Sequence, residues 1–287
     1  FRTLSIFLAG TLIHAFPFIQ QDWDWSSFRI MGVLQRIALA YGIAAIMVIH
    51  LDLKKIFISA LGILIAYWGI LWIGGGEYPY SLEHNLIRKI DIFLLGESHL
   101  YGGTGIQFDP EGLLSTIPSV VTVLIGYLVG SMLHTTKDFL DNVKRMSTFG
   151  IGLIIVGVIW GLLFPINKQL WTSSYVLFTG GIATLILSSL CFMIDIKKWK
   201  KPLWVFQIFG TNSIFLFVLS GLWTKIILRL RFDLEGQSIS GYGYLYKTLF
   251  VPIGGDMFGS FLFAFAHLVG FWLILLWLYR KKIFINL

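Results

Sequence analysis

Two arginines stand at the edge of an apolar run, where a charged group needs a partner. They bound the stretch Arg29-Ile-Met-Gly-Val-Leu-Gln-Arg36, in which Gln35 is a further polar group. If the stretch is helical, Arg29, Gly32 and Arg36 share one face, because they are spaced by three and four residues. A guanidinium at membrane depth is costly, so it serves a phosphate, a carboxylate or a structural ion pair. Ion pairing and ligand binding both remain open for Arg36.

The sequence Phe-Asp-Pro-Glu-Gly, with its two carboxylates, precedes another apolar run. Asp109 at the N-cap, Pro110 at the first helical position and Glu111 in the first turn predict a helix start, because these residues satisfy or avoid unpaired amides at the positive helix end. Asp109 and Glu111 are the candidate partners of Arg36. The functional alternative is a general base that acts on an amine or hydroxyl, with His99 as a second candidate.

Further polar groups occur where hydrocarbon is expected. Asn167, Trp171 and Ser174 fall on one helical face if the chain is helical there, and with Lys168 they are candidate pocket residues and hydrogen-bond donors. Trp171 could equally be an interfacial anchor. Asn212 lies within a seventh apolar run and is expected to bind a neighbouring helix or a ligand. No His, Cys or carboxylate pair has metal-ligand spacing, so no metal site is predicted.

The elements that carry these residues are predicted to be membrane-spanning helices. The 287 residues are 56% hydrophobic and 13% charged, with a mean hydropathy of +0.79, which is too apolar for a water-exposed domain. Uncharged runs of about 20 residues match the helix length that crosses a bilayer. Only helices satisfy the backbone in such continuous runs, so the predicted fold is an all-α polytopic bundle of about eight transmembrane helices in a single domain, residues 1–287. The runs are Thr3–Gln21, Ile37–Leu51 with an extension to about Ile30, Ile56–Gly76, Leu113–Leu133, Met146–Ile166, Leu170–Ile194, Pro202–Thr224 and Met257–Tyr279.

Basic residues predict the orientation of this bundle. The segments on the side of the C-terminus hold 13 of the 22 basic residues but 4 of the 15 acidic ones, which places the C-terminus in the cytoplasm. The net charge of +7 is explained by anionic lipid, without nucleic acid. Two long loops, 74–112 and 225–256, then lie outside, and the polar composition of the first predicts that any chemistry occurs near the outer face.

The motifs also carry a family resemblance. The sequence resembles bacterial relatives of heparan-alpha-glucosaminide N-acetyltransferase, the lysosomal transmembrane acetyltransferase, and the similar stretches occur in order across nearly the whole chain. They are Arg29-Ile-Met-Gly-Val-Leu-Gln-Arg, Ile90-Asp-Ile-Phe-Leu-Leu-Gly, His99-Leu-Tyr, Phe108-Asp-Pro-Glu-Gly, Asn167-Lys-x-x-Trp-x-x-Ser-Tyr, the Asn212-Ser pair and Tyr279-Arg-Lys-Lys-Ile-Phe.

The resemblance implies an enzyme of a bacterial cytoplasmic membrane that passes acetyl from cytosolic acetyl-CoA to a glucosamine-type acceptor on the outer face. It implies eleven helices, of which these are the last eight. The family's catalytic histidine lies in an earlier outer loop that nothing here matches, so the chain is expected to be truncated or to have lost that segment. The alternatives are an amino-sugar or other small-molecule transporter, whose path the same polar residues would line, and a membrane scaffold. The acceptor and the oligomeric state, a homodimer included, stay open.

Overall fold

The computed structural model describes residues 1–18, 24–133 and 135–285, and the chain divides into two compact units. The first comprises Phe1–His14 and Gln20–Trp199, and the second comprises Ala15–Ile19 and Lys200–Leu287. Helices dominate both units, and the described residues form one two-stranded sheet. The all-α prediction is confirmed, while a single domain over residues 1–287 stays a prediction.

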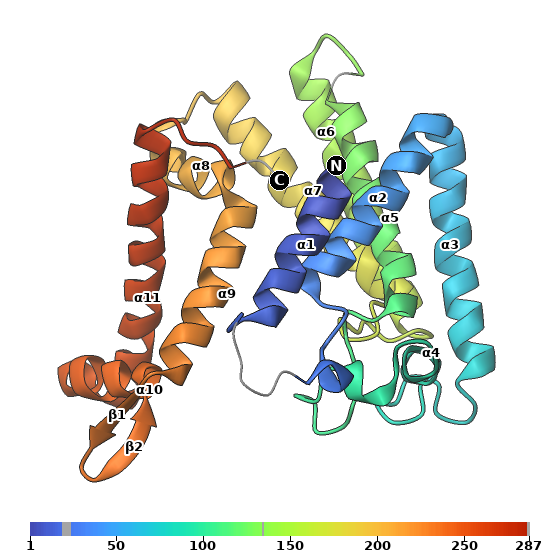
Figure 1. Cartoon of the computed structure of the whole chain (residues 1–287). Helices are drawn as coiled ribbons and strands as arrows, with labels where there is room; N and C mark the ends of the chain where they lie inside the picture. The colour runs from blue at the N-terminus through green and yellow to red at the C-terminus, as the bar shows by residue number, and fades with distance from the viewer. Residues whose placement is uncertain (19–23, 134, 286–287) are drawn as a thin grey trace. The chain divides into compact units, whose positions relative to one another are not determined.

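The first unit is a bundle of long helices with one short helix at one end (Figure 1). The short helix α4 lies at the lower end in the view of Figure 1, and the turn between α2 and α3 lies at the upper end. The helices are α1 (Arg2–Ala15), α2 (Val33–His50), α3 (Leu53–Gly74), α4 (Leu86–Leu95), α5 (Leu113–Met132), α6 (Phe139–Gly161) and α7 (Ser173–Cys191), with the 3-10 turns η1 (Trp25–Ser27) and η2 (Glu97–His99) and the π-helical extension η3 (Phe192–Ile196).

Six helices in the described residues are long and apolar enough to cross a membrane, or seven if one bent pair counts as a single span. The molecule is therefore a multi-pass membrane protein, with a span count close to the predicted eight. The predicted first span, Thr3–Gln21, corresponds to the 14-residue α1, and residues 19–21 of it lie outside the described part. The six are Val33–His50, Leu53–Gly74, Leu113–Met132, Phe139–Gly161, Ser173–Ile196 and Gly241–Arg280, and the pair is Trp204–Thr211 with Ser213–Arg229.

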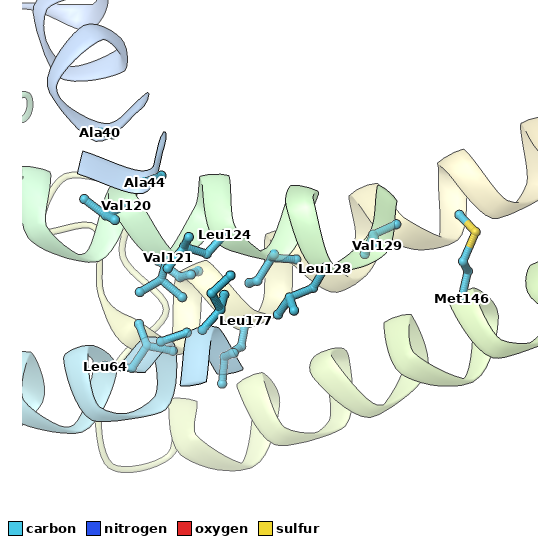
Figure 2. Packing of buried hydrophobic residues seen from close by; sticks show 14 residues of the cluster. Ala40, Ala44, Leu64, Val120, Val121, Leu124, Leu128, Val129, Met146 and Leu177 are labelled. Atoms are coloured by element: carbon cyan, nitrogen blue, oxygen red, sulfur yellow. The ribbon is translucent and has the colours of Figure 1, made fainter. Parts of the chain in front are cut away.

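Helix α5 is the centre of the first unit. Its residues Val121, Leu124 and Leu128 are buried against Leu64 of α3 and Leu177 of α7, and the same cluster takes in α2 and α6 (Figure 2). The buried faces of the four neighbouring helices thus fix the position and direction of α5. They also fix the position of the segment that leads into it.

Helices α6 and α7 approach each other closely through glycines. A Cβ atom on Gly157 would lie 2.7 Å from the backbone nitrogen of Phe178, and one on Gly181 would lie 2.6 Å from the carbonyl oxygen of Gly150. Small residues let helix backbones come together in membranes, where packing rather than the hydrophobic effect holds helices side by side. The pair therefore depends on these three glycines.

Two helices begin later than the sequence predicts. Helix α2 begins at Val33, and Gly32 before it is extended with a φ of −178°, so Arg29, Gly32 and Arg36 do not share a helical face. Helix α5 begins at Leu113, so the prediction of Asp109 as its N-cap was wrong. In both places, side chains from distant parts of the chain bind the segment before the helix. These tertiary contacts, and not the local sequence, decide where the helix begins.

Helix α7 likewise begins at Ser173, and Thr172 is its N-cap. The predicted face of Asn167, Trp171 and Ser174 therefore does not exist, since Asn167 and Trp171 lie in a turn before the helix. Trp171 has a φ of +48°, a left-handed conformation that no helix continues through.

The second unit contains the bent helix pair and a hairpin. Helices α8 and α9 meet at Asn212 with a bend of 76°, so the predicted span Pro202–Thr224 is broken rather than continuous. The two residues of the hairpin turn, Glu235 and Gly236, both have positive φ, as the tight turn between its strands requires. The elements are the 3-10 turn η4 (Lys201–Leu203), α8 (Trp204–Thr211), α9 (Ser213–Arg229), β1 (Arg231–Leu234), β2 (Gln237–Ser240), α10 (Gly241–Leu245), the π-helical η5 (Tyr246–Phe250) and α11 (Val251–Arg280), which is broken at Gly254 and Gly255.

Candidate functional site

An ion cluster lies where α2 and α5 begin. Arg29 Nε and Nη2 donate to Asp109 Oδ2 and Oδ1, both at 2.8 Å, and Nη2 also donates to Glu111 Oε2 at 2.9 Å. The Asp109 side chain is fully buried. Two parallel hydrogen bonds from a planar guanidinium to a carboxylate form a strong and directional contact. Arg29 therefore binds the segment before α5 to the segment before α2.

Arg36 completes the cluster from the first turn of α2. Its Nη1 donates to the carbonyl oxygen of Pro110 at 2.9 Å, and its Nη2 lies 3.8 Å from Glu111 Oε1. The guanidinium also stacks over the ring of Trp171, 3.8 Å from the ring centroid. The predicted ion pair of Arg36 is thus present with Glu111, at a longer distance than that of Arg29.

Trp171 is fixed beneath Arg36. Its Nε1 donates to Thr122 Oγ1 of α5 at 3.2 Å, and the ring contacts Tyr175 edge-on at 5.0 Å. A cation over an indole face is favourable, more so where water is excluded. Trp171 is therefore a platform for the Arg36 guanidinium.

Glu111 is the reachable carboxylate of the cluster. Its side chain is 15% exposed, whereas Asp109 is fully buried and uses both oxygens on Arg29. Two arginines face two carboxylates, so the cluster is neutral when all four groups are ionised. The starts of α2, α5 and α7 converge here and add partial positive charge from their dipoles. The arrangement can bind a polar ligand and accept a proton at Glu111.

Asp91 of α4 is a buried acid that the sequence reasoning did not select. Its Oδ1 accepts hydrogen bonds from the amides of Leu113 and Leu114, at 3.0 and 3.4 Å, so it caps α5 from another helix. Its Oδ2 has no hydrogen-bond partner among the described residues. Burial, with a smaller contribution from the charge of Asp109, raises the pKa of Asp91 to about 7 against the lowering effect of the two amides. The sequence feature that could have identified Asp91 is its position inside an apolar segment, where a carboxylate needs a partner.

His99 belongs to the same end of the unit through the backbone. Its Nδ1 donates to the carbonyl oxygen of Phe28 at 2.7 Å, since a carbonyl oxygen can only accept. Nearby, the ring of Tyr101 lies 4.7 Å from the guanidinium carbon of Arg29. His99 thus joins the loop before α2 to the loop before α5 without an ion pair to the cluster.

Gln35 is a buried amide at the start of α2. It is 1% exposed, and neither its nitrogen nor its oxygen has a hydrogen-bond partner among the described residues. A Cβ atom on Gly10 of α1 would lie 2.5 Å from Gln35 Oε1, so α1 packs directly against this amide. A buried amide without partners is unusual, which keeps Gln35 as a candidate pocket residue.

The remaining predicted residues lie apart from the ion cluster, and three of them bind backbone groups. Asn167 Oδ1 accepts from two backbone amides of its own turn, and Ser174 Oγ donates to the carbonyl oxygen of Phe164. Lys168 is exposed. Asn212 lies in the second unit, where it binds the backbone of the C-terminal segment through Ile283 and Ile285. None of these four joins the ion cluster by a hydrogen bond or an ion pair.

No group of three or more His, Cys, Asp or Glu that could hold a metal ion occurs among residues 1–18, 24–133 and 135–285.

The fold and the cluster define a multi-pass helical membrane protein with a buried charged site at one end of its first unit. The chain is a relative of the heparan-alpha-glucosaminide N-acetyltransferases. It is 30% identical to the Homo sapiens protein over a match that covers 76% of this chain and 40% of the relative. It is 28% identical to the Mus musculus protein over a match that covers 76% of this chain and 41% of the relative. The chain thus spans about two fifths of the length of these curated relatives. No protein-family model matches it.

Proposed function

We propose that the chain carries the acceptor pocket of a transmembrane acetyltransferase, which moves acetyl from acetyl-CoA to the nitrogen of a glucosamine-type sugar. The relatives, which are named as N-acetyltransferases of a glucosaminide, support this class of reaction. The ion cluster supports the location, because its arginines and its one partly exposed carboxylate offer hydrogen-bond donors and an acceptor to a polar sugar. The observation that carries the location of the site is Glu111, partly exposed between Arg29 and Arg36.

The proposed chemistry is acyl transfer from a thioester to an amine. The nitrogen forms a bond to the acetyl carbonyl carbon, the carbon–sulfur bond breaks, and the thiol of coenzyme A leaves. A base must take the proton that the nitrogen loses, and hydrogen-bond donors must stabilise the oxyanion of the tetrahedral intermediate. Glu111 is our candidate for the base, and the guanidinium of Arg36 is a candidate donor. Asp109 and His99 are secondary candidates, since Asp109 is fully engaged by Arg29.

The proposed orientation puts this site at the outer face of a bacterial cytoplasmic membrane and the C-terminus in the cytoplasm. The excess of basic residues in the segments on the C-terminal side supports it. Cytosolic acetyl-CoA would then approach from the basic side, and the sugar from the side of the 74–112 loop. In this orientation the ion cluster, at the start of α2 and α5, lies at the outer end of the bundle. The acetyl group must therefore move from the cytosolic side to that end before it reaches the sugar.

The test uses the full-length protein and radiolabelled acetyl-CoA with glucosamine as acceptor. We expect Glu111→Gln to lower kcat by about 10²–10⁴-fold, the range for loss of a general base. Glu97→Gln is the matched control, because Glu97 is exposed and pairs with Arg88 in the loop; it should keep full activity. The proposal fails if the wild-type protein shows neither acetyl transfer nor thermal stabilisation by coenzyme A, and Glu111 is excluded as base if its variant is as active as the control.

A transporter for an amino sugar or another small molecule is the second candidate. The observation that favours it is the break between α8 and α9, a bend of 76° inside one apolar run, because discontinuous helices line the substrate sites of many transporters. Uptake of labelled glucosamine into proteoliposomes without acetyl-CoA would favour this function. Uptake that requires acetyl-CoA, with recovery of the acetylated sugar, would favour the enzyme.

A further inference from the structure

The first unit also contains an apolar groove, at a place separate from the ion cluster. It is a groove of about 870 Å³ between α3 and α6, with α5 and α7 as its floor. Its lining is mostly apolar, with Phe57 and Leu61 of α3 and Leu153 and Val156 of α6 on the walls, and Val121 and Ile125 of α5 on the floor.

The groove faces away from the buried core. Phe57 and Val156, on opposite walls, are 51% and 50% exposed. Gly152 also lines it, and a Cβ atom there would meet nothing within 4 Å. An open apolar groove in a membrane-spanning bundle is surrounded by lipid chains, so hydrocarbon is its natural filling.

Charged side chains occupy one end of the groove. Lys144 and Arg145 of the second turn of α6 line it together with Asp141, whose Oδ2 accepts from Arg145 Nε at 2.9 Å. The two cations outnumber the one carboxylate, and all three residues are exposed or half-exposed. This end is the one that the basic-residue pattern assigns to the cytoplasmic side, where anionic lipids are concentrated.

We propose that this groove binds one anionic phospholipid. Its acyl chains lie along the apolar walls of α3 and α6, and its phosphate contacts Lys144 and Arg145. The combination of long apolar walls with a cationic end matches the two parts of a phospholipid, whereas a neutral transmembrane helix would leave the Lys144 charge without a partner at the groove. The proposal is independent of the acetyltransferase activity.

The first experiment measures lipid retention by native mass spectrometry. The full-length protein is purified from detergent with equal amounts of dioleoylphosphatidylglycerol and dioleoylphosphatidylcholine added, and the bound lipid is identified. We expect one phosphatidylglycerol per chain, and we expect Lys144→Gln with Arg145→Gln to reduce its retention by about thirtyfold, the factor for two lost cations at an anionic lipid headgroup. Lys197→Gln with Lys198→Gln removes the same charge elsewhere on the basic side and should retain the lipid.

The second experiment fills the groove without disturbing the core. Gly152→Leu places a side chain in open space within the groove, and Gly62→Leu does so on α3 outside it, since a Cβ atom at Gly62 also meets nothing within 4 Å. We expect lipid loss from the first variant only, with equal melting temperatures for both. Equal retention of the two lipids by the wild type would overturn the proposal. So would unchanged lipid retention in both Gly152→Leu and the double variant Lys144→Gln with Arg145→Gln. A change of oligomeric state in Gly152→Leu without lipid loss would assign the groove to a second copy instead.

Discussion

The carboxylate of Asp109 is fully buried, and its charge is stabilised by one arginine. Arg29 binds both of its oxygens, and it does so from a segment that lies 80 residues earlier in the chain. Removal of one partner from a buried pair leaves an uncompensated charge, which costs far more than the pair itself contributes. The cluster therefore couples stability to the geometry of the candidate site.

Arg29→Gln should lower the free energy of unfolding by about 3 kcal/mol, because it leaves the buried Asp109 carboxylate without its cation. Thermal unfolding in detergent measures the change. Arg145→Gln, which breaks an exposed pair with Asp141, should cost less than about 1 kcal/mol. The double variant Arg29→Gln with Asp109→Asn should recover part of the loss; if it is no more stable than Arg29→Gln alone, the unpaired charge is not the cause.

Asp91 should make stability depend on pH. Its folded pKa of about 7 lies above the ordinary value of 3.8, so the folded chain binds the extra proton. This contribution is fully present below about pH 4 and is lost as the pH rises through 7, with roughly 2–3 kcal/mol of it lost between pH 5 and 8. Melting temperatures of the wild type and Asp91→Asn over this range measure it. We expect the wild type to lose stability relative to the variant as the pH rises; parallel curves would contradict the prediction.

At the scale of elements, helix starts and helix pairs depend on contacts from elsewhere in the chain. The start of α5 is capped by Asp91 from α4, and Gly112 is needed there because a Cβ atom would overlap Asp91 Oδ2. The segment 74–112, which the sequence predicts to be an outer loop, contains α4 and is thus an ordered part of the bundle. The apolar pattern identifies α5 correctly, but its first residue is decided by a side chain 22 positions away.

The glycines between α6 and α7 provide an element-scale prediction. Gly157→Leu should destabilise the protein by about 1–3 kcal/mol or more, because its side chain meets the backbone of α7 at Phe178 and Ser174. Thermal unfolding in detergent measures the loss. Gly152→Leu, five residues earlier on the same helix and in open space, should leave stability nearly unchanged. Equal destabilisation by both would mean that helix propensity, and not the close approach of α6 and α7, decides the effect.

At the scale of the whole molecule, the orientation in the membrane is open to a direct test. On a Cys191→Ser background, Tyr78→Cys in the 74–112 loop should react with a membrane-impermeant maleimide in intact cells, since Tyr78 is exposed. Lys198→Cys, in the basic segment after α7, should react only after the membrane is opened. Labelling is read by mass shift on gels. The reverse pattern would place the ion cluster on the cytoplasmic side and contradict the proposed approach of the acceptor.

The sequence by itself determined the class of molecule and most of its spans. The hydrocarbon core contains no water to bind the backbone, so an uncharged run of about 20 residues must form a helix to cross it. The same reasoning selected Arg29, Arg36, Asp109 and Glu111, because charges beside such runs must find partners.

Tertiary structure alone decided how those residues meet. The helical faces predicted for Arg29–Arg36 and Asn167–Ser174 do not form, and Asp91 joined the site although its local sequence gave it no partner. Asn212 belongs to the second unit, bound to the C-terminal segment. Spacing along the chain reports which side chains share a face only within one helix. Ion pairs and caps between segments 22 to 80 residues apart depend on packing, which a local pattern does not contain.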